Sequence, residues 1–536
     1  MTLGIVLSSA FIVVLDNSVL NVAIPTILRD FHTTLPSVQW VVTGYALTFA
    51  SLLIIGGRLG DLYGHRRIFI IGAALFGAGS LLASLSWNVS SLVLGEAIIE
   101  GIGASLMLPA TLAIISNTFQ GAERALAFAA WGTTAGAAAA FGPLVGGFLT
   151  TEYSWRWAFR INVIVAPVAI LGAVLFMRRT QPATERRPRL DTTGAALVAA
   201  GMFLLVFALS DGATYGWLRP VKDFSVFGAR VWPTSLPISV IPLIFVAAAV
   251  ILTAFYRLER RKEREDRGPL FAFGQLRTLT FRYGLLTTTL LAMGQLGLLF
   301  VLPLFLQEGR HLSAETNGLW MLPTGVFIVF GAQLGGRLTR RLGTTAVARS
   351  GLVLETIGLV VVALVVSPHL TFVTLLPGFA LYGFGIGFAS SQLTNIVLSA
   401  IEPGEAGSAS GANTTVRQIG AALGVAVIGS IVTTETIRRA VPAVHAAGGL
   451  SRAVQTQAVA RLRALGPNFV PPRLATPHEA ATLERIVATA VSSATRPSLL
   501  FAAAVVGAGA TISLLIPRIG PPVELEDVEA LELANA

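Results

Sequence analysis

Residues 56–67 read GGRLGDLYGHRR, and a partial copy, GRLTRRLG, recurs at residues 336–343. Each stretch closes an apolar segment and leads directly into another, so the copies predict a chain of two homologous halves. Two repeated halves around a site near the bilayer midplane are the usual construction of a secondary transporter. The sequence contains no Walker-type nucleotide-binding loop, so ATP is not the predicted energy source.

The composition predicts an all-α, polytopic membrane protein. Hydrophobic residues make up 54% of the 536 residues and charged residues only 12%, with a mean hydropathy of +0.73. Soluble proteins average about 25% charged residues. Apolar runs near the length that spans a bilayer recur throughout, and they are continuous, which excludes a β-barrel. The chain has no cysteine and its six histidines are scattered, so we expect neither disulfides nor a metal centre.

The spacing of the apolar runs predicts fourteen membrane helices. We expect a six-helix half over 1–178, two inserted helices over 179–280, a second six-helix half over 281–517 and a tail over 518–536. The spans are predicted at 3–25, 38–57, 68–87, 91–117, 125–149, 157–177, 192–210, 236–256, 282–306, 316–338, 346–367, 371–399, 408–433 and 498–517.

Arginine-rich loops set the predicted orientation. The loop after the sixth span holds five arginines between residues 178 and 189, and the loop after the eighth contains RLERRKEREDRG at 257–268. GHRR at 64–67 and RLTRR at 337–341 fall on the same side, which places these loops and both termini in the cytoplasm. The net charge of +10 therefore indicates membrane topology, not nucleic-acid binding. The stretch 434–497 would lie outside. Its helical patches, such as SRAVQTQAVARLRALG at 451–466, could be amphipathic surface pieces or a cap over the outer mouth, but we favour a solvated loop.

The strongest motif is the stretch around residues 57–67. Glycines such as Gly57 and Gly64 allow two helices and a tight loop to pack closely. Asp61 and Arg66 are expected to form a salt bridge that stabilises one conformation of a gate.

This stretch resembles the signature motif of the major facilitator superfamily, and of its fourteen-span, EmrB/QacA-like drug:proton antiporter branch in particular. LDNSVLNVAIPTI at 15–27, SVQWVVTGYALTFASLLIIGGRLGD at 37–61 and GSASGANTTVRQIGAALGVAVIG at 407–429 also resemble that branch. GTTAGAAAAFGPLVGGF at 132–148 resembles the antiporter motif of the fifth span. The resemblance implies that this helix forms a close contact that seals or rocks during transport, through Gly132, Gly136, Gly142, Pro143, Gly146 and Gly147.

Four charged residues inside predicted spans are candidates for the proton and substrate site. Asp16 is a lone acid in the first span, where proton or cation handling competes with a structural anchor on Asn17 or Asn21. Glu96 and Glu100 lie four residues apart, on one helix face. Two carboxylates this close in a low-dielectric site cannot both ionise cheaply, which predicts proton exchange over a static network. Arg417 needs a partner, which any of the three acids could supply.

Two other polar positions are assigned lesser roles. Glu355 is assigned a structural role, because its helix corresponds to a peripheral one in the fold that the resemblance implies. Arg160 and Asn162 are expected at the membrane interface.

The sequence also departs from the pattern that it resembles. The branch expects an arginine in the fourth span, within a run of the form RxxQG. Here Ala97 stands at the arginine position and Glu100 at the glutamine position. The role of that arginine therefore does not carry over.

These features predict a proton-driven antiporter of the cytoplasmic membrane that exports lipophilic, cationic drugs or other toxic compounds. Its expected partners are a small-molecule substrate, protons and membrane lipids, without a cofactor. One alternative is an exporter of a lipid, siderophore or natural product made by the cell, and another is a membrane receptor or scaffold that transports nothing. No nucleophile–base arrangement supports an enzyme.

Overall fold

The computed structural model describes residues 1–33, 35–177, 190–226, 229–265, 267–367 and 370–520. The basic loop at 178–189 and most of the predicted tail lie outside this part. The first half comprises α1 (Thr2–Asp30), α2 (Leu35–Tyr63), α3 (His65–Ser84), α4 (Val89–Leu92), the π-helix η1 (Val93–Glu100), α5 (Gly101–Thr118), α6 (Gly121–Glu152) and α7 (Trp157–Phe176). The inserted region comprises α8 (Thr192–Tyr215), β1 (Phe224–Val226), β2 (Ala229–Trp232), α9 (Val240–Arg264) and η2 (Phe273–Arg277).

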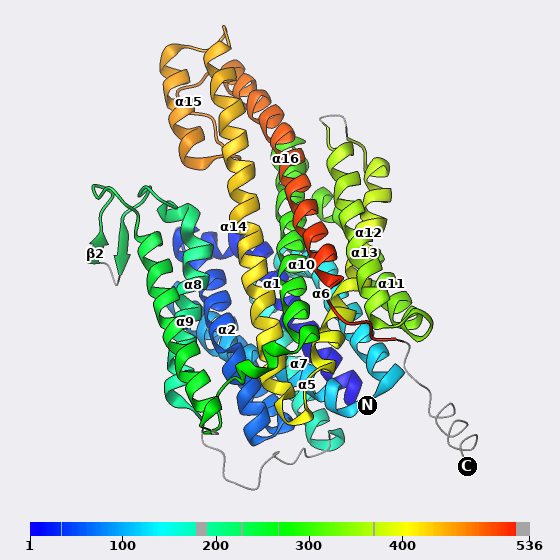
Figure 1. The fold of residues 1–536 in the computed structure, drawn as a ribbon. Coiled ribbons are helices and arrows are strands. Elements are labelled where there is room, and N and C mark those ends of the chain that lie inside the picture. Colours follow the sequence, from blue (N-terminus) through cyan, green and yellow to red (C-terminus); the bar gives the residue numbers. More distant parts are fainter. Residues whose placement is uncertain (34, 178–189, 227–228, 266, 368–369, 521–536) are drawn as a thin grey trace, which may run out of the picture.

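The second half begins after η2 (Figure 1). It comprises α10 (Leu279–Leu304), η3 (Phe305–Gly309), α11 (Ala314–Leu342), α12 (Thr344–Val365), α13 (Phe372–Ser399), η4 (Pro403–Glu405), α14 (Ala406–Ala446), α15 (Arg452–Leu465) and α16 (Pro477–Ser513).

Within the described residues, twelve helices are long and apolar enough to cross a membrane. The remaining two predicted spans, 3–25 and 125–149, fall on α1 and α6, which are long helices but are not among those twelve. The helical, multi-span architecture is confirmed, and the count of fourteen crossings stays a prediction. The antiparallel hairpin β1–β2 between α8 and α9 is a small addition that the apolar runs did not predict.

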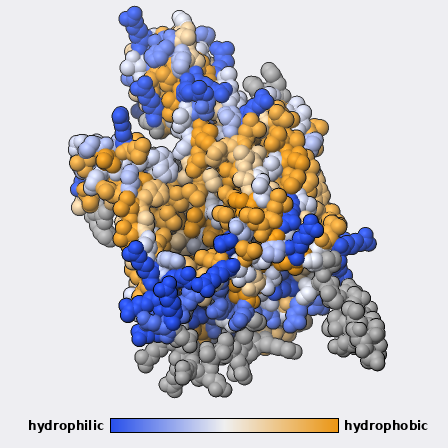
Figure 2. Space-filling model, in the orientation of Figure 1, coloured by the Kyte–Doolittle hydropathy of each residue, from blue (hydrophilic) through white to orange (hydrophobic). Residues whose placement is uncertain are grey.

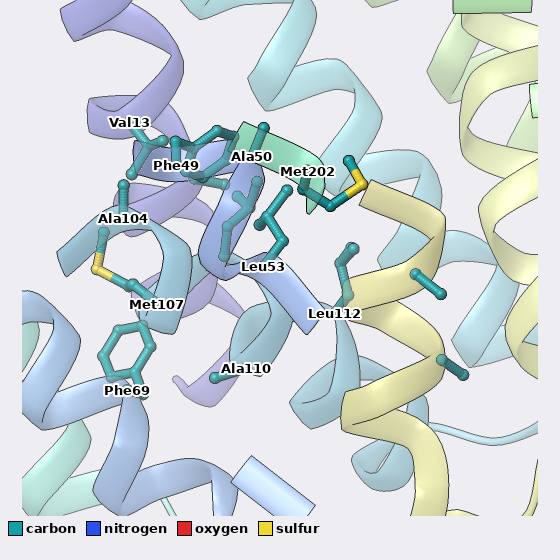
Figure 3. Packing of buried hydrophobic residues seen from close by; sticks show 14 of the residues in the cluster. Val13, Phe49, Ala50, Leu53, Phe69, Ala104, Met107, Ala110, Leu112 and Met202 are labelled. Atoms are coloured by element: carbon teal, nitrogen blue, oxygen red, sulfur yellow. The ribbon is translucent and has the colours of Figure 1, made fainter. Parts of the chain in front are cut away.

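The two halves meet along two seams. At one seam α6 packs against α11 and α13, and at the other α2 packs against α14. The inserted helix α8 packs against α2 and α14 and so covers the second seam, and α9 packs on α8. Figure 3 shows this packing, in which Met202 of α8 lies near Ala50 and Leu53 of α2. Hydrophobic side chains fill the middle of the molecular surface in Figure 2, and hydrophilic ones gather towards the end below it.

The interpretation of residues 434–497 as a solvated loop is wrong for most of its length. α14 continues to Ala446, α16 already begins at Pro477, and α15 lies between them. The 41 residues of α14 are about 61 Å long, roughly twice the hydrocarbon thickness of a bilayer. These helices form a projection with its own apolar core, which includes Val454, Leu462 and Leu483 (Figure 1). Its contribution to function stays untested.

Glycines set the close approach of helices in both halves. A Cβ atom added at Gly103 of α5 would lie 2.4 Å from the backbone nitrogen of Phe76 in α3. In the second half, a Cβ at Gly385 of α13 would lie 2.4 Å from the backbone nitrogen of Glu355 in α12. Small residues permit such backbone contact between membrane helices. The internal repeat that the sequence predicts is therefore visible as a repeated packing contact.

We expect Gly103→Ala to destabilise the protein by about 1–3 kcal/mol, because the added methyl group overpacks the α3–α5 contact. Gly147→Ala in α6 is the matched control: a Cβ there meets no described atom within 4 Å, and alanine favours a helix. Thermal unfolding in detergent measures both. A Gly103→Ala protein as stable as wild type would contradict the proposed packing.

Candidate functional site

Asp16 of α1 and Glu96 and Glu100 of η1 form one cluster of acids. Each offers a carboxyl oxygen, and these oxygens all lie within 4.8 Å of one another. The side chains are closed off from solvent, with 3% exposure for Asp16 and 0% for both glutamates. The prediction that the glutamates share a face is confirmed, and the structure adds Asp16 from a second helix.

The π-helix η1 carries both glutamates. π-helical turns are rare, form i→i+5 hydrogen bonds and occur frequently at functional sites. Gly95 brings η1 against α3, since a Cβ there would lie 2.7 Å from the backbone nitrogen of Ala83. On the opposite helix, a Cβ at Gly79 would lie 2.5 Å from the backbone nitrogen of Glu100. This contact presses the acid-bearing turn into the interior of the first half.

Asn162 of α7 completes the cluster. Its Nδ2 donates to Asp16 Oδ1 at 2.7 Å and to Glu100 Oε1 at 3.1 Å, and its side chain is 1% exposed. The expected interfacial position of Asn162 is therefore wrong. The signal in the sequence was an amide inside a strongly apolar helix, which in a membrane requires a polar partner. The alternative anchors Asn17 and Asn21 have side chains outside the described part.

The cluster holds more acceptors than donors. One oxygen each of Asp16 and Glu100 and both oxygens of Glu96 are buried without a hydrogen-bond partner among the described residues. None of the described ion pairs includes any of these three acids. Three neighbouring carboxylates cannot all be charged at such a site, because mutual repulsion and desolvation both favour the protonated form. The arrangement can therefore bind protons between helices.

Arg417 does not join this cluster. It lies half-buried on α14 in the second half and forms no ion pair or hydrogen bond within the described part of the chain. Its helix packs against α2, α10 and α16, whereas α1, η1, α3 and α7 surround the acids. Arg417 therefore forms no ion pair with these acids in this conformation, and its membership of one proton and substrate site with them stays a prediction.

Asp61 connects the two halves. Its Oδ1 and Oδ2 accept hydrogen bonds from the backbone nitrogens of Gly407 and Ser408, both at 2.7 Å. These amides belong to the first turn of α14, where a carboxylate also interacts favourably with the helix dipole. His65 Nε2 lies 3.6 Å from Asp61 Oδ1. A Cβ at Gly57 would lie 2.1 Å from the Gly407 carbonyl oxygen, so glycine permits the contact.

The expected salt bridge between Asp61 and Arg66 is not formed. Arg66 instead donates from Nε to the Ala173 carbonyl at 3.0 Å and from Nη2 to the Val174 carbonyl at 2.6 Å. It therefore binds the unsatisfied carbonyls at the end of α7. Gly64, between the two residues, has φ 90°, which glycine adopts at little cost. Arg349 of α12 similarly binds the carbonyl of Ser513, the last residue of α16, and the carbonyl of Ile516 just beyond it, a contact that the sequence did not predict.

The glycines of α6 face different neighbours. Added Cβ atoms would lie 3.1 Å from Ser391 Cβ at Gly132 and 2.5 Å from Ile328 Cγ2 at Gly136, both across the seam with the second half. Gly146 faces α1, where its added Cβ would lie 3.0 Å from Val19 Cα. Gly142 lies within α6, and the side chain of Pro143 is outside the described part. α6 therefore contacts both the second half and α1, the helix that carries Asp16.

Comparisons with known proteins agree with this architecture. The family model described as Major Facilitator Superfamily matches residues 6–229 and 224–425. A "Probable actinorhodin transporter" of Streptomyces coelicolor is 36% identical, covering 80% of this chain and 72% of the relative. A puromycin resistance protein of Streptomyces alboniger is 32% identical, covering 81% of this chain and 82% of the relative. A "Tetracenomycin C resistance and export protein" of Streptomyces glaucescens is 28% identical, covering 97% of this chain and 92% of the relative.

Solved structures share the fold at low sequence identity. The human organic anion transporter MFSD10 (TETRAN) superposes with a TM-score of 0.58 at 13% identity, covering 94% of this chain and 98% of its own. The proton:xylose symporter XylE superposes with a TM-score of 0.55 at 14% identity, covering 99% of this chain and 98% of its own.

We expect Asp61→Asn to weaken the closed contact between α2 and α14 by about 1–2 kcal/mol, because an amide interacts less strongly with the helix terminus. The chain has no cysteine, so Ser410→Cys provides a single reporter. Ser410 of α14 is buried and donates to the Pro109 carbonyl of α5 at 3.1 Å, at the contact of α14 with the first half. Labelling of this cysteine by a thiol reagent should accelerate about 5–30-fold.

Glu123→Gln, an exposed acid in the first turn of α6, is the control and should leave the labelling rate unchanged. Equal labelling rates in the Asp61→Asn and wild-type backgrounds would exclude Asp61 as part of the gate.

Proposed function

The chain belongs to the Major Facilitator Superfamily, and from that premise we propose that it is a proton-coupled antiporter that exports toxic, lipophilic compounds across the cytoplasmic membrane. It is a multi-pass membrane transporter and not an enzyme, as the sequence predicted. The observation that carries the proposal of proton coupling is the enclosed cluster of Asp16, Glu96, Glu100 and Asn162.

The relatives support drug export. Their names refer to resistance against puromycin and lincomycin and to the export of tetracenomycin C. We therefore place the substrate among antibiotics and similar lipophilic compounds. Within that class we propose lipophilic cations, because a site with acidic groups attracts positive charge when it opens. A natural product made by the producing cell is the second candidate, which the transporter and export names favour.

Protonation is proposed to control how tightly the first half closes. With protons bound, the three carboxyl groups are neutral, and α1, η1 and α7 can enclose them as in this structure. Loss of a proton leaves a buried charge that is unfavourable without water or a cation. Deprotonation therefore favours a conformation in which the acids meet solvent or substrate. One elementary charge moving through 100 mV is worth about 2.3 kcal/mol, so inward proton movement can drive export.

The proposed branch is the fourteen-span, EmrB/QacA-like one, with α1 and α6 as the two further crossings. Both helices are long, and both pack into the bundle through the contacts of Gly146 and Gly136. Both termini are proposed to lie in the cytoplasm, on the side of the arginine-rich loops.

We expect the double variant Glu96→Gln, Glu100→Gln to lower substrate-driven proton flux at least tenfold, because neither amide can release a proton. The substrate is first chosen by testing toxic dyes and antibiotics in a strain that lacks its own pumps. The flux is then measured in proteoliposomes under an imposed pH gradient. Glu484→Gln, an exposed acid of α16, is the control. Full proton coupling in the double variant would refute the assignment of these glutamates.

A further inference from the structure

A second buried carboxyl group lies in the other half of the molecule. Glu355 of α12 is 0% exposed, and neither of its carboxyl oxygens has a hydrogen-bond partner within the described residues. None of the ion pairs in the described part of the chain includes it. The structural role that the sequence assigned to Glu355 gives no reason for an acid here, since an apolar side chain would pack without a desolvation cost.

Two other helices place polar side chains near Glu355. Gln295 of α10 and Tyr382 of α13 interact electrostatically with its carboxyl group, and of the two only Tyr382 is titratable. The Tyr382 hydroxyl donates to the Gln295 backbone carbonyl at 3.1 Å, and Gln295 Nε2 donates to Ser390 Oγ at 3.0 Å. These contacts hold a polar cluster within the apolar core of the second half.

This cluster lies where the internal repeat places the acids of the first half. Gln295 follows Asp16 by 279 residues, the same offset that separates Gly64 from Gly343. The offset also relates Gly79 to Gly358. A Cβ at Gly79 would lie 2.5 Å from the Glu100 backbone nitrogen, and one at Gly358 would lie 2.4 Å from the Tyr382 backbone nitrogen. Gln295 and Tyr382 thus occupy the places of Asp16 and Glu100, and α12 contributes Glu355 as the acid.

We propose that Glu355 is a second proton-binding site of the transporter, located in the C-terminal half and enclosed by Gln295 and Tyr382. The carboxyl group carries its proton in the conformation described here, because no described cation compensates a negative charge at this position. It exchanges that proton when α12, α13 and α10 rearrange during the transport cycle. Each half then holds a protonation site, and both sites bias the closed packing of their own helices.

This inference rests on the proposed proton-coupled function for its role in transport, but proton binding itself can be measured separately. Infrared difference spectra of the purified full-length protein, recorded over a range of pH, detect the carbonyl stretch of a protonated carboxyl group. We expect Glu355→Gln to remove one pH-dependent carboxyl band that wild type and the exposed-site control Glu484→Gln retain. Glu355→Asp keeps a carboxyl group and should retain this band at a shifted position. It therefore shows whether the loss of the band in Glu355→Gln reflects misfolding.

In proteoliposomes, Glu355→Gln should lower the ratio of protons to transported compound while transport of that compound continues. The proposal would be overturned if Glu355→Gln kept all the pH-dependent carboxyl bands of wild type. It would also be overturned if the band that the variant loses did not change with pH in wild type. The latter result would identify a permanently protonated structural acid. Absence of substrate-dependent proton flux in wild type would instead reject the antiporter function, and the infrared titration would still decide whether Glu355 exchanges a proton.

Discussion

The burial of three carboxyl groups inside an apolar helix bundle is the constraint on which the rest of the structure depends. Each charged side chain near a bilayer centre costs about 2.5–3.5 kcal/mol on insertion scales, so an ionised cluster would be strongly unfavourable. Asp16, Glu96 and Glu100 nevertheless place carboxyl oxygens within 4.8 Å of one another, and Asn162 donates hydrogen bonds to Asp16 and Glu100. Backbone contact between α3 and η1 at Gly79 and Gly95 makes this enclosure possible. In the proposed mechanism, enclosure of the cluster therefore requires its protonation.

The cluster is linked to the interface between the halves by direct packing. Val19 follows Asp16 by three residues on α1 and contacts Gly146 of α6. Further along α6, Gly136 contacts Ile328 of α11 in the second half. At the other seam, Asp61 binds the first turn of α14. Movement of α1 upon loss of a proton would therefore disturb a helix that touches both halves. This chain of contacts offers a route by which proton binding could alter access to a substrate.

The sequence predicted what depends on local pattern. The lengths of the continuous apolar runs located the long helices, and the i,i+4 spacing predicted that Glu96 lies beside Glu100. Interactions between residues distant in the chain were less accessible. Asp61 was predicted to pair with nearby Arg66, whereas its partners are backbone amides 346 and 347 residues away. Asn162 was assigned to the interface because Trp155 and Trp157, which are typical of the interface, shortly precede it in the sequence. In the projection formed by α14, α15 and α16, the helical pattern of residues 451–466 was noted, but a solvated loop was favoured over helices that pack on one another around an apolar core.

The most direct test of proton exchange at Asp16, Glu96 and Glu100 is a count of protons released when a transported compound binds to the purified protein in weakly buffered detergent solution. Binding favours a conformation in which the acids lose a proton, so wild type should acidify the solution in proportion to the compound bound. Replacing all three acids by their amides should abolish the release from this cluster. Proton release unchanged by that triple replacement, or no release from a wild-type protein that binds and transports the compound, would contradict the account.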